Sequence, residues 1–292
     1  MQEKEGVFMS TSIMSGLGSS LNTLDKIRAA QSSSIQKITT GSKYPDASYG
    51  PSDYAILQRT YSNIGAVSQS NSNTQTSNSM LSTAAGAVNE TVSSLSSLRS
   101  TLLNASNGTN GTTDLSALQK SVDQTIAAVN DNASVTYNGK QLLDGSQSLT
   151  VAGVDGYSTV SLGNMTSQGL GLTDSEGKST INLTDSSSLS SALAKVDTAL
   201  GSALDQATSI GAAQEGLSYQ SSNYTTQETA LYSTASTQGD TDIAAESVKL
   251  ASSNTQEQAA LFAIKAGMQN MSQNMLSSLN DHSRGAATSM LM

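Results

Sequence analysis

The feature that most constrains this chain is the near absence of proline from long stretches of helically spaced apolar residues. The two prolines among its 292 residues are Pro45 and Pro51, and proline is the residue that breaks helices. On both sides of this pair, apolar residues recur mostly three or four positions apart, which is the spacing of one helix face. The periodicity therefore predicts very long helices.

Three helices are predicted before residue 135. The second starts near Asp53, fades through the Ser- and Asn-rich stretch 68–79 and resumes over 81–102, where Val92 is one of its apolar positions. Its roughly 50 residues would span about 75 Å. The third follows a turn-forming stretch, with Asp114 at its expected N-cap. The first helix carries the stripe Leu17, Leu21, Leu24, Ile27, Ile35 and Ile38.

Two further helices are predicted in the C-terminal part. Asp185 or Ser186 is the expected cap of the fourth, whose apolar stripe includes Leu200 and Leu204 at coiled-coil spacing. The last helix follows Gly239 and carries apolar groups on more than one face. Such a surface is costly in a lone monomer and favourable where neighbouring copies bury it.

The segment between the third and fourth helices has a β texture. Asn138-Gly139 is a strong signal for a two-residue hairpin turn, and residues 148–163 alternate around Asp155-Gly156 as a second hairpin. Residues 164–185 are Gly-rich and weakly patterned. The predicted fold is mainly α: a long coiled-coil helical rod in which the first helix pairs with the last, with a small central β-hairpin region.

Composition narrows the class of function. Hydrophobic residues make up 36% of the chain and charged residues 13%, and there is no Trp and no Cys. Few large side chains are present to line a ligand pocket, and cysteine chemistry is excluded, so an enzyme is disfavoured and no cofactor is expected. A net charge of −9 argues against a nucleic-acid partner. No segment has the length and hydropathy of a membrane span or a signal peptide.

Four motifs, in order along the chain, resemble bacterial flagellin. Residues 21–41 are similar to the family's N-terminal segment, and residues 137–143 resemble its F-N-G-x-x-L-L turn. Residues 240–246 resemble the D-x-D-[YIM]-A-x-E entry to the C-terminal helix, and residues 275–279 stand in place of the terminal L-x-L-L. The chain departs from the family pattern at residues 49–53, where the usual D-D-A-A-G is replaced.

The resemblance implies a structural subunit that polymerises with copies of itself into the flagellar filament, outside the cell, after export without a cleaved signal peptide. It also implies an export chaperone and hook-associated and cap proteins as partners. The implied domains are an inner helical domain formed by 1–44 and 240–292, a rod domain formed by 45–145 and 187–239, and a small β-rich outer segment, 146–186. Met9 aligns near the family's usual start, and a tail follows residue 279.

The candidate functional residues are assembly residues; no catalytic, cofactor or metal site is expected. His282 is the single His, and we interpret it as a solvated surface residue. Asp240 and Asp242 are interpreted as helix-capping residues. The predicted subunit interface comprises the stripe of the first helix together with Leu261, Phe262, Ile264, Met268, Met271, Met275, Leu276 and Leu279.

One further segment follows from the resemblance. Flagellins that activate a vertebrate innate receptor carry L-Q-R-V-R-E-L-A-V before the loop at 104–111. Here the matching residues 95–103 keep the second Arg as Arg99, whereas Ser97 replaces the first Arg and Thr101 replaces a Leu. The expectation is weak receptor activation.

Two other functions compete with the filament subunit. The hook–filament junction protein has similar ends, but the spacing from Gly41 to Ile56 and the Asn138-Gly139 turn favour flagellin. A flagellin-like surface adhesin or polysaccharide-binding protein is the alternative from another class. The central segment, which is short and nearly free of aromatic residues that stack on sugars, disfavours it.

Overall fold

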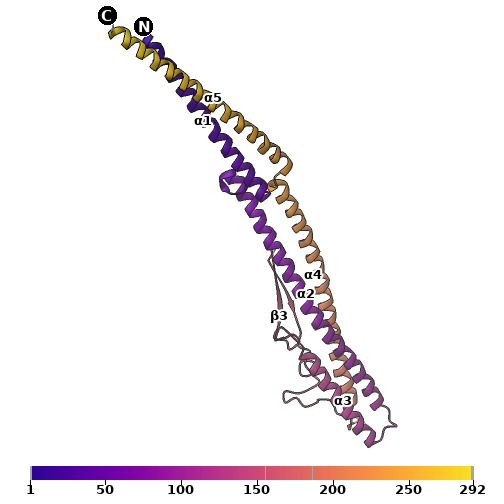
Figure 1. Cartoon of the computed structure of the whole chain (residues 1–292). Coiled ribbons are helices and arrows are strands. Elements are labelled where there is room, and N and C mark those ends of the chain that lie inside the picture. The colour runs from indigo at the N-terminus through magenta and orange to yellow at the C-terminus, as the bar shows by residue number, and fades with distance from the viewer. Residues whose placement is uncertain (1, 155, 186, 291–292) are drawn as a thin grey trace. The chain divides into compact units, whose positions relative to one another are not determined.

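The structure is a computed structural model that describes residues 2–154, 156–185 and 187–290. Its helices are α1 (Gln2–Thr40), α2 (Pro51–Ala105), α3 (Thr112–Ala133), α4 (Leu189–Gly239) and α5 (Ile243–Met290), with a short 3-10 turn at Ala47–Tyr49 (Figure 1). Strands β1 (Thr136–Tyr137) and β2 (Lys140–Gln141) pair antiparallel, as do β3 (Ser148–Gly153) and β4 (Gly156–Ser161). The mainly α fold class is confirmed.

The chain divides into two compact units. The first contains the residues up to Thr60 and those from Ser233 onward, and the second contains Tyr61–Tyr232. The β-rich stretch 146–186 lies within the second unit. The finer division into inner, rod and outer domains stays a prediction.

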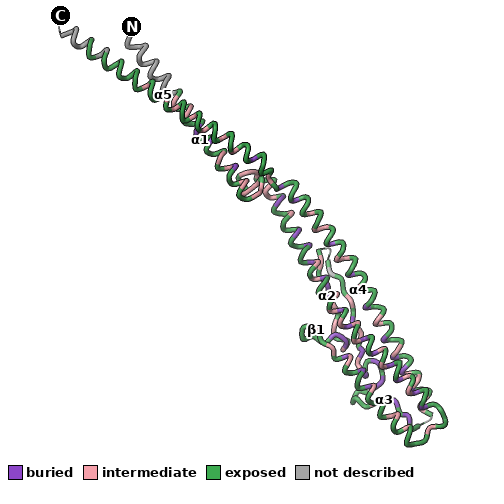
Figure 2. The backbone as a smooth tube through the Cα atoms, turned by 45° about the vertical axis from the view of Figure 1, so that its right-hand side comes forward, coloured by how far each residue is buried: buried purple, intermediate pink, exposed green. Residues whose placement is uncertain are grey.

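In the first unit, α1 and α5 lie side by side, as both backbone views show (Figures 1 and 2). On α1, Leu24, Ile27 and Ser34 are buried. Leu24 and Ile27 belong to the apolar stripe seen in the sequence, and burying them removes apolar surface from water. The predicted pairing of the first helix with the last is confirmed.

Two backbone hydrogen bonds join the end of α1 to the junction between α4 and α5. The Lys43 N–H donates to the Gly239 carbonyl at 2.7 Å, and the Thr241 N–H donates to the Gly41 carbonyl at 2.9 Å. Gly41 has a φ of 69°, a conformation that L side chains rarely adopt. A Cβ on Gly239 would lie 2.7 Å from Leu57 Cδ2, so a larger residue there would have to displace the Leu57 side chain.

The turn before α2 is where the sequence departs from the family pattern. Asp46 caps the 3-10 turn by accepting from the Ser48 N–H at 2.7 Å, and the Tyr49 hydroxyl donates to Gln36 Oε1 on α1. The helix then begins at Pro51, where a missing N–H costs nothing because the first helical N–H has no intrahelical partner. The different residues thus still form an ordered turn attached to α1.

In the second unit, the buried face of α2 follows a heptad from Ser70 onward, after the buried Ile64 and Val67, which lie three positions apart. From Ser70 the buried residues alternate four and three positions apart and are Ser70, Thr74, Ser77, Leu81, Ala84, Val88, Thr91, Leu95, Leu98, Leu102 and Ala105. The seam therefore continues through the stretch where the apolar pattern fades. The sequence interpretation placed Val92 in the seam, but Thr91 is the fully buried residue and Val92 is half-buried.

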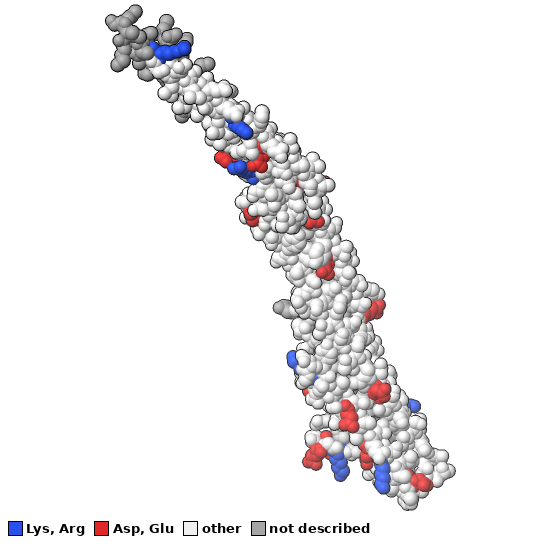
Figure 3. Space-filling view, viewed as in Figure 1, with Lys and Arg blue, Asp and Glu red and all other residues white. Residues whose placement is uncertain are grey.

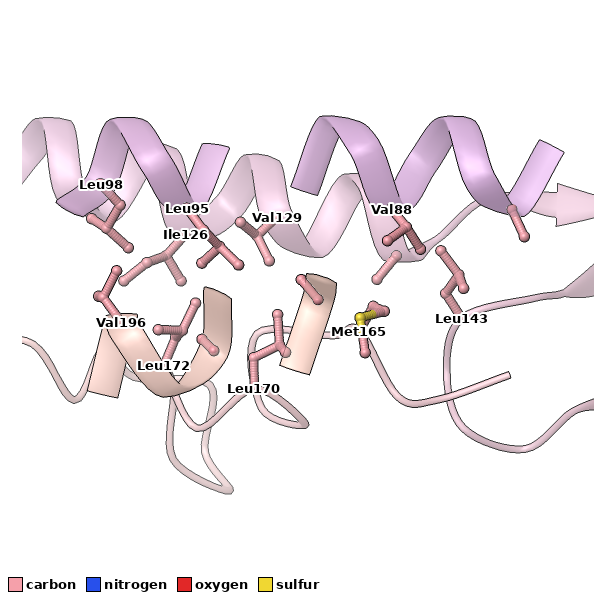
Figure 4. Packing of buried hydrophobic residues seen from close by; sticks show 14 of the residues in the cluster. Val88, Leu95, Leu98, Ile126, Val129, Leu143, Met165, Leu170, Leu172 and Val196 are labelled. Carbon is pink, nitrogen blue, oxygen red and sulfur yellow. The ribbon is translucent and has the colours of Figure 1, made fainter. Parts of the chain in front are cut away.

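The seam of α4 also differs from its prediction. Small residues form much of it: Ala192, Ala199 and Ala203 are buried, followed by Ile210, Leu217 and Tyr224. Leu204 is exposed, so the predicted stripe was wrong at this position, whereas Leu200 is half-buried and packs against the core. The seam of α4 contributes to one core together with α2 and α3. Figure 4 shows Val196 facing Leu98, Ile126 and Leu172 in this core.

Two predicted caps are also corrected. Gly111, not Asp114, is the N-cap of α3; Asp114 stands three residues later, and its Oδ2 accepts from the Gly111 N–H at 3.0 Å. Asp185 accepts from the Ser187 N–H in a turn before α4, and the helix begins at Leu189. Ser186, the other candidate cap, lies outside the described residues.

The weakly patterned stretch after β4 supplies part of the core. Its buried residues Met165, Leu170, Leu172, Ile181 and Leu183 pack in the same cluster as α2, α3 and α4. The second hairpin is confirmed, with Gly153 opposite Gly156 and Val154 in its turn. Gly153 also lies against the Tyr224 hydroxyl, where a Cβ would overlap it. The hairpin therefore packs against α4 at this position.

Candidate assembly surface

The predicted interface residues of α1 divide into two groups. Leu24 is 5% exposed and Ile27 is 9% exposed, so both are used within the chain to hold α5. Leu21 and Ile35 are exposed, whereas Leu17 and Ile38 are half-buried. α1 thus has an inner apolar face that is covered within the chain and an outer apolar face that remains open to water.

The predicted residues of α5 are mostly exposed. Phe262 is 75% exposed and Leu279 is 66% exposed. Ile264 and Met271 are half-buried. The other exposed members of this set are Leu261, Met268, Met275 and Leu276.

Charge is sparse over the same helix. Residues 258–279 contain a single charged side chain, Lys265. Figure 3 shows that uncharged atoms make up most of the visible surface of the molecule. Large exposed apolar side chains with few charges among them are typical of a surface that another protein covers.

A hollow of about 560 Å³ lies between residues 16–20 of α1 and residues 263–274 of α5. It is lined by Gly16, Leu17, Ser20, Ala263, Gly267, Asn270 and Asn274. Because most of these side chains are small, the two helices leave a space that their own residues do not fill.

Two glutamates of α5 fasten it to α1, and sequence reasoning did not find either contact. Glu246, in the first turn of α5, is buried; its Oε1 accepts from the Ser34 hydroxyl at 2.8 Å and its Oε2 pairs with Lys249 at 3.0 Å. Hydrogen bonds from Lys249 and Ser34 lower the pKa of the Glu246 carboxyl below its ordinary value. The carboxylate is therefore held charged in the helix interface.

The second contact lies further along the pair. Glu257 Oε1 accepts from Arg28 Nε at 3.0 Å, and Glu257 Oε2 accepts from Gln31 Nε2 at 2.9 Å. Hydrogen bonds from Gln31 and then Arg28 lower the pKa of the Glu257 carboxyl. Together with Glu246, this contact fixes one register of α5 along α1.

The receptor-type segment on α2 is occupied by contacts within the chain. Arg99 Nε lies 2.6 Å from Asp197 Oδ1 on α4. The Thr101 hydroxyl donates to the Ser97 carbonyl at 3.1 Å, and Ser97 is exposed. The retained arginine is thus engaged with α4, and the two substituted positions present small polar groups.

The two aspartates at the start of α5 have structural contacts. Asp242 Oδ1 accepts from the Ala245 N–H at 3.0 Å, which caps α5, and the Ser236 hydroxyl donates to Asp240 Oδ2. Among the residues that the structure describes, no three His or acidic side chains lie close enough to hold a metal ion. The side chain of His282 is outside that set. Within the same residues, no helix combines the length and hydropathy needed to cross a bilayer.

A second hollow, of about 910 Å³, lies between α3 and the loop 166–182. Its buried hydroxyls are paired with each other, since Ser167 Oγ and Thr173 Oγ1 lie 3.1 Å apart. The Gln119 side chain donates to the Ile181 carbonyl and accepts from the Leu183 N–H. The polar groups at this place therefore hold the loop on α3.

Long paired helices with two small strand pairs define a mainly α-helical protein. Residues 12–148 match the bacterial flagellin N-terminal helical region, and residues 193–279 match the bacterial flagellin C-terminal helical region. The chain belongs to the bacterial flagellin family.

Individual relatives agree with this assignment. A flagellin of Clostridium tyrobutyricum is 31% identical over 132 residues, which cover 45% of this chain and 35% of the relative. The flagellar filament 30.7 kDa core protein of Treponema maltophilum is 27% identical over 228 residues, covering 73% of this chain and 80% of that protein. The match therefore spans only about a third of the Clostridium protein.

Among solved structures, a putative flagellar hook-associated protein from Vibrio parahaemolyticus is similar in fold. Its TM-score is 0.56 at 17% identity, and the alignment covers 65% of this chain and 99% of that one. At this identity the likeness concerns the fold alone.

Proposed function

We propose that this chain is a structural subunit that polymerises with copies of itself into a flagellar filament, through the exposed apolar faces of α1 and α5. The observation that carries the proposal is the exposure of Phe262, Leu276 and Leu279 in a stretch of α5, residues 258–279, whose single charged side chain is Lys265. Apolar surface of this kind gains free energy when it is removed from water, in proportion to the area covered. Its occupant is a second copy, because family membership implies self-assembly.

The inner contacts support the same proposal. Leu24 and Ile27 with Glu246 and Glu257 hold the two helices as one pair, so that the outer residues form a single surface instead of two separate helices. The hollow beside Gly267 offers space for a side chain from a neighbouring copy. A preformed pair loses less conformational freedom on assembly than two free segments.

The test compares two substitutions at one position. Phe262→Asp places a charge on the proposed interface at a site that is open to water in the single chain, so the subunit itself is expected to keep its fold. Phe262→Leu is the matched control, because it keeps an apolar side chain. Purified subunits are mixed with short filament seeds, and elongation is followed by sedimentation and negative-stain microscopy.

The expected result is elongation by the wild type and by Phe262→Leu, and none by Phe262→Asp. Burying an unpaired carboxylate costs several kcal/mol, on the order of a thousandfold in an association constant. Normal elongation by Phe262→Asp would contradict the proposed interface. Circular dichroism of each subunit separates loss of assembly from loss of fold.

The hook–filament junction protein is the competing function, and the fold likeness to a hook-associated protein keeps it in view. The two differ in their products: a filament subunit elongates without limit on seeds of its own kind, whereas a junction protein stops after a limited assembly. A surface adhesin or polysaccharide-binding protein would instead bind a glycan as a monomer, and a glycan array would detect that binding. We favour the filament because the matched relatives include a filament core protein.

The remaining partners belong to the same proposal. An export chaperone would cover the exposed face of α5 before assembly, and hook-associated and cap proteins would contact the ends of the filament. Extracellular placement after export without a cleaved signal peptide follows from the proposed filament. Co-purification of the chain with a chaperone that protects α5 from proteolysis is the direct check.

A further inference from the structure

The chain contains three Asn-Gly pairs, at 107–108, 110–111 and 138–139, and the structure places them in three different environments. We propose that Asn107 is a site of spontaneous deamidation in the folded protein, and that the other two asparagines are protected by their contacts and backbone geometry. This inference does not depend on the proposed function. It concerns the loop between α2 and α3 and the β1–β2 turn.

The chemistry needs only water. The Gly108 backbone nitrogen attacks Asn107 Cγ and gives up its proton, a C–N bond forms, and the side-chain amide leaves as ammonia. Water then opens the cyclic imide at either carbonyl, which gives aspartate or isoaspartate. Glycine favours this step because no Cβ shields the attacking nitrogen, and both reacting groups must be free to approach.

Asn107 meets these conditions. It lies in the exposed turn after α2, and within the described turn no hydrogen bond involves its carboxamide or the Gly108 N–H. The turn holds Asn107 by its backbone: its N–H donates to the Asn104 carbonyl at 3.0 Å, and its carbonyl accepts from the Asn110 N–H and from Asn110 Nδ2, both at 3.2 Å. A Cβ on Gly108 would meet nothing within 4 Å, so there is open space beside the Cα that carries the attacking nitrogen.

Asn110 is held on both reacting groups. Its Nδ2 donates to the Asn104 carbonyl at 2.6 Å and to the Asn107 carbonyl at 3.2 Å. The Gly111 nitrogen, which would have to attack, donates to Asp114 Oδ2 at 3.0 Å in the capping box of α3. Reaction at Asn110 therefore requires these bonds to break first, one of them to a charged carboxylate.

Asn138 is held by its backbone. It has a φ of 50° and Gly139 a φ of 77°, as a two-residue turn between paired strands requires. Closing the imide ring fixes the rotation about the Cα–C bond of the asparagine, and a change of this rotation in the turn would disturb the pairing of the two strands. The β1–β2 pairing of Tyr137 with Lys140 opposes the change.

Conversion at Asn107 alters the loop chemically. Each event adds one negative charge to a chain whose net charge is −9, two residues after the C-terminal end of α2, where the helix dipole disfavours it. Isoaspartate also lengthens the backbone by one carbon inside the turn. The product is thus expected to loosen the α2–α3 turn as the protein ages.

The experiment incubates the purified full-length chain in ¹⁸O-water at neutral and mildly alkaline pH, and maps label and isoaspartate by peptide mass spectrometry. The folded chain is expected to convert Asn107 about tenfold or more faster than Asn110 or Asn138, since breaking the protecting bonds raises the barrier. In denaturant the deamidation rates of the three sites are expected to lie within about threefold of one another, because local sequence then determines the rate.

Two variants separate the causes. Gly108→Ala, which fits the open space and a φ outside the left-handed region, is expected to slow Asn107 severalfold with the fold unchanged. Asp114→Ala frees the Gly111 N–H and is expected to raise conversion at Asn110 severalfold. Equal rates at the three sites in the folded chain would overturn the proposal. So would an Asn107 that reacts in the denatured chain but not in the folded chain. A glycan at Asn107 would overturn it as well.

Discussion

At the scale of single residues, the contact that organises the first unit is a buried carboxylate. Glu246 is buried between a hydroxyl on α1 and an ammonium on its own helix. A charge in such a place is favourable only with its partners present, so removing one partner is more harmful than the net value of the contact suggests. Its position makes the helix pair sensitive to pH.

The pH dependence follows from the sign of the pKa shift. Pairing lowers the pKa of Glu246 below its ordinary value of 4.5. Its contribution to helix pairing is therefore fully present above pH 4.5 and is lost as pH falls through the lowered pKa. We expect assembled protein to dissociate at a higher pH in Glu246→Gln than in the wild type, as measured by sedimentation across a pH series. Glu246→Gln polymers with unchanged acid stability would contradict this role.

A second residue-scale prediction concerns the receptor-type segment of α2. Arg99 is paired with Asp197, and Ser97 and Thr101 replace an arginine and a leucine of the activating pattern. Arginine and large apolar groups dominate interface energies, at about 2 kcal/mol or more each. The receptor affinity of depolymerised subunits is therefore expected to be at least about a hundredfold weaker than that of a strongly activating flagellin. A reporter-cell titration measures this. Restoring both residues with Ser97→Arg and Thr101→Leu is the gain-of-function control.

At the scale of helices, the α2 seam changes character along its length. Its buried residues are Ser70, Thr74 and Ser77 in one part and, from Leu81 onward, leucine, alanine and valine together with Thr91. The hydroxyls of Ser70 and Thr74 bond to carbonyls of their own helix, so they add little to pairing between helices. We expect amides of residues 70–77 to exchange with solvent faster than those of 84–102 in hydrogen-exchange mass spectrometry. Uniform protection along α2 would show that side-chain polarity does not control local opening.

The same helices show what sequence can predict. The existence of each long helix and of both hairpins followed from periodicity and turn residues, which are local signals. The positions of the α2 and α4 seams did not fully follow, because Thr91 and Ala199 lie in the core while Leu204 does not. Apolar size marks a seam only where large residues fill it. The polar contact between Ser34 and Glu246 joins residues 212 positions apart, so no local pattern reveals it.

At the scale of the whole molecule, the chain combines one unit with a buried core and another that leaves large apolar side chains exposed. The core of the second unit draws on α2, α3, α4 and the stretch 142–183. The first unit rests mainly on one pair of helices, with Leu24 and Ile27 between them. A two-helix pair buries little surface per residue, so its stability depends on neighbours to a greater degree.

This asymmetry predicts how proteolysis changes with assembly. In isolated subunits the terminal helices are expected to open often enough for a protease to trim both ends, which leaves a resistant core near residues 45–240. In assembled protein the exposed faces of α1 and α5 are covered, and mass action stabilises the paired helices by the free energy of binding. Limited digestion followed by intact mass measurement distinguishes the two states. Phe262→Asp, which is expected not to assemble, should be trimmed under all conditions, whereas equal resistance of free and assembled wild type would mean that the helix pair is already stable alone.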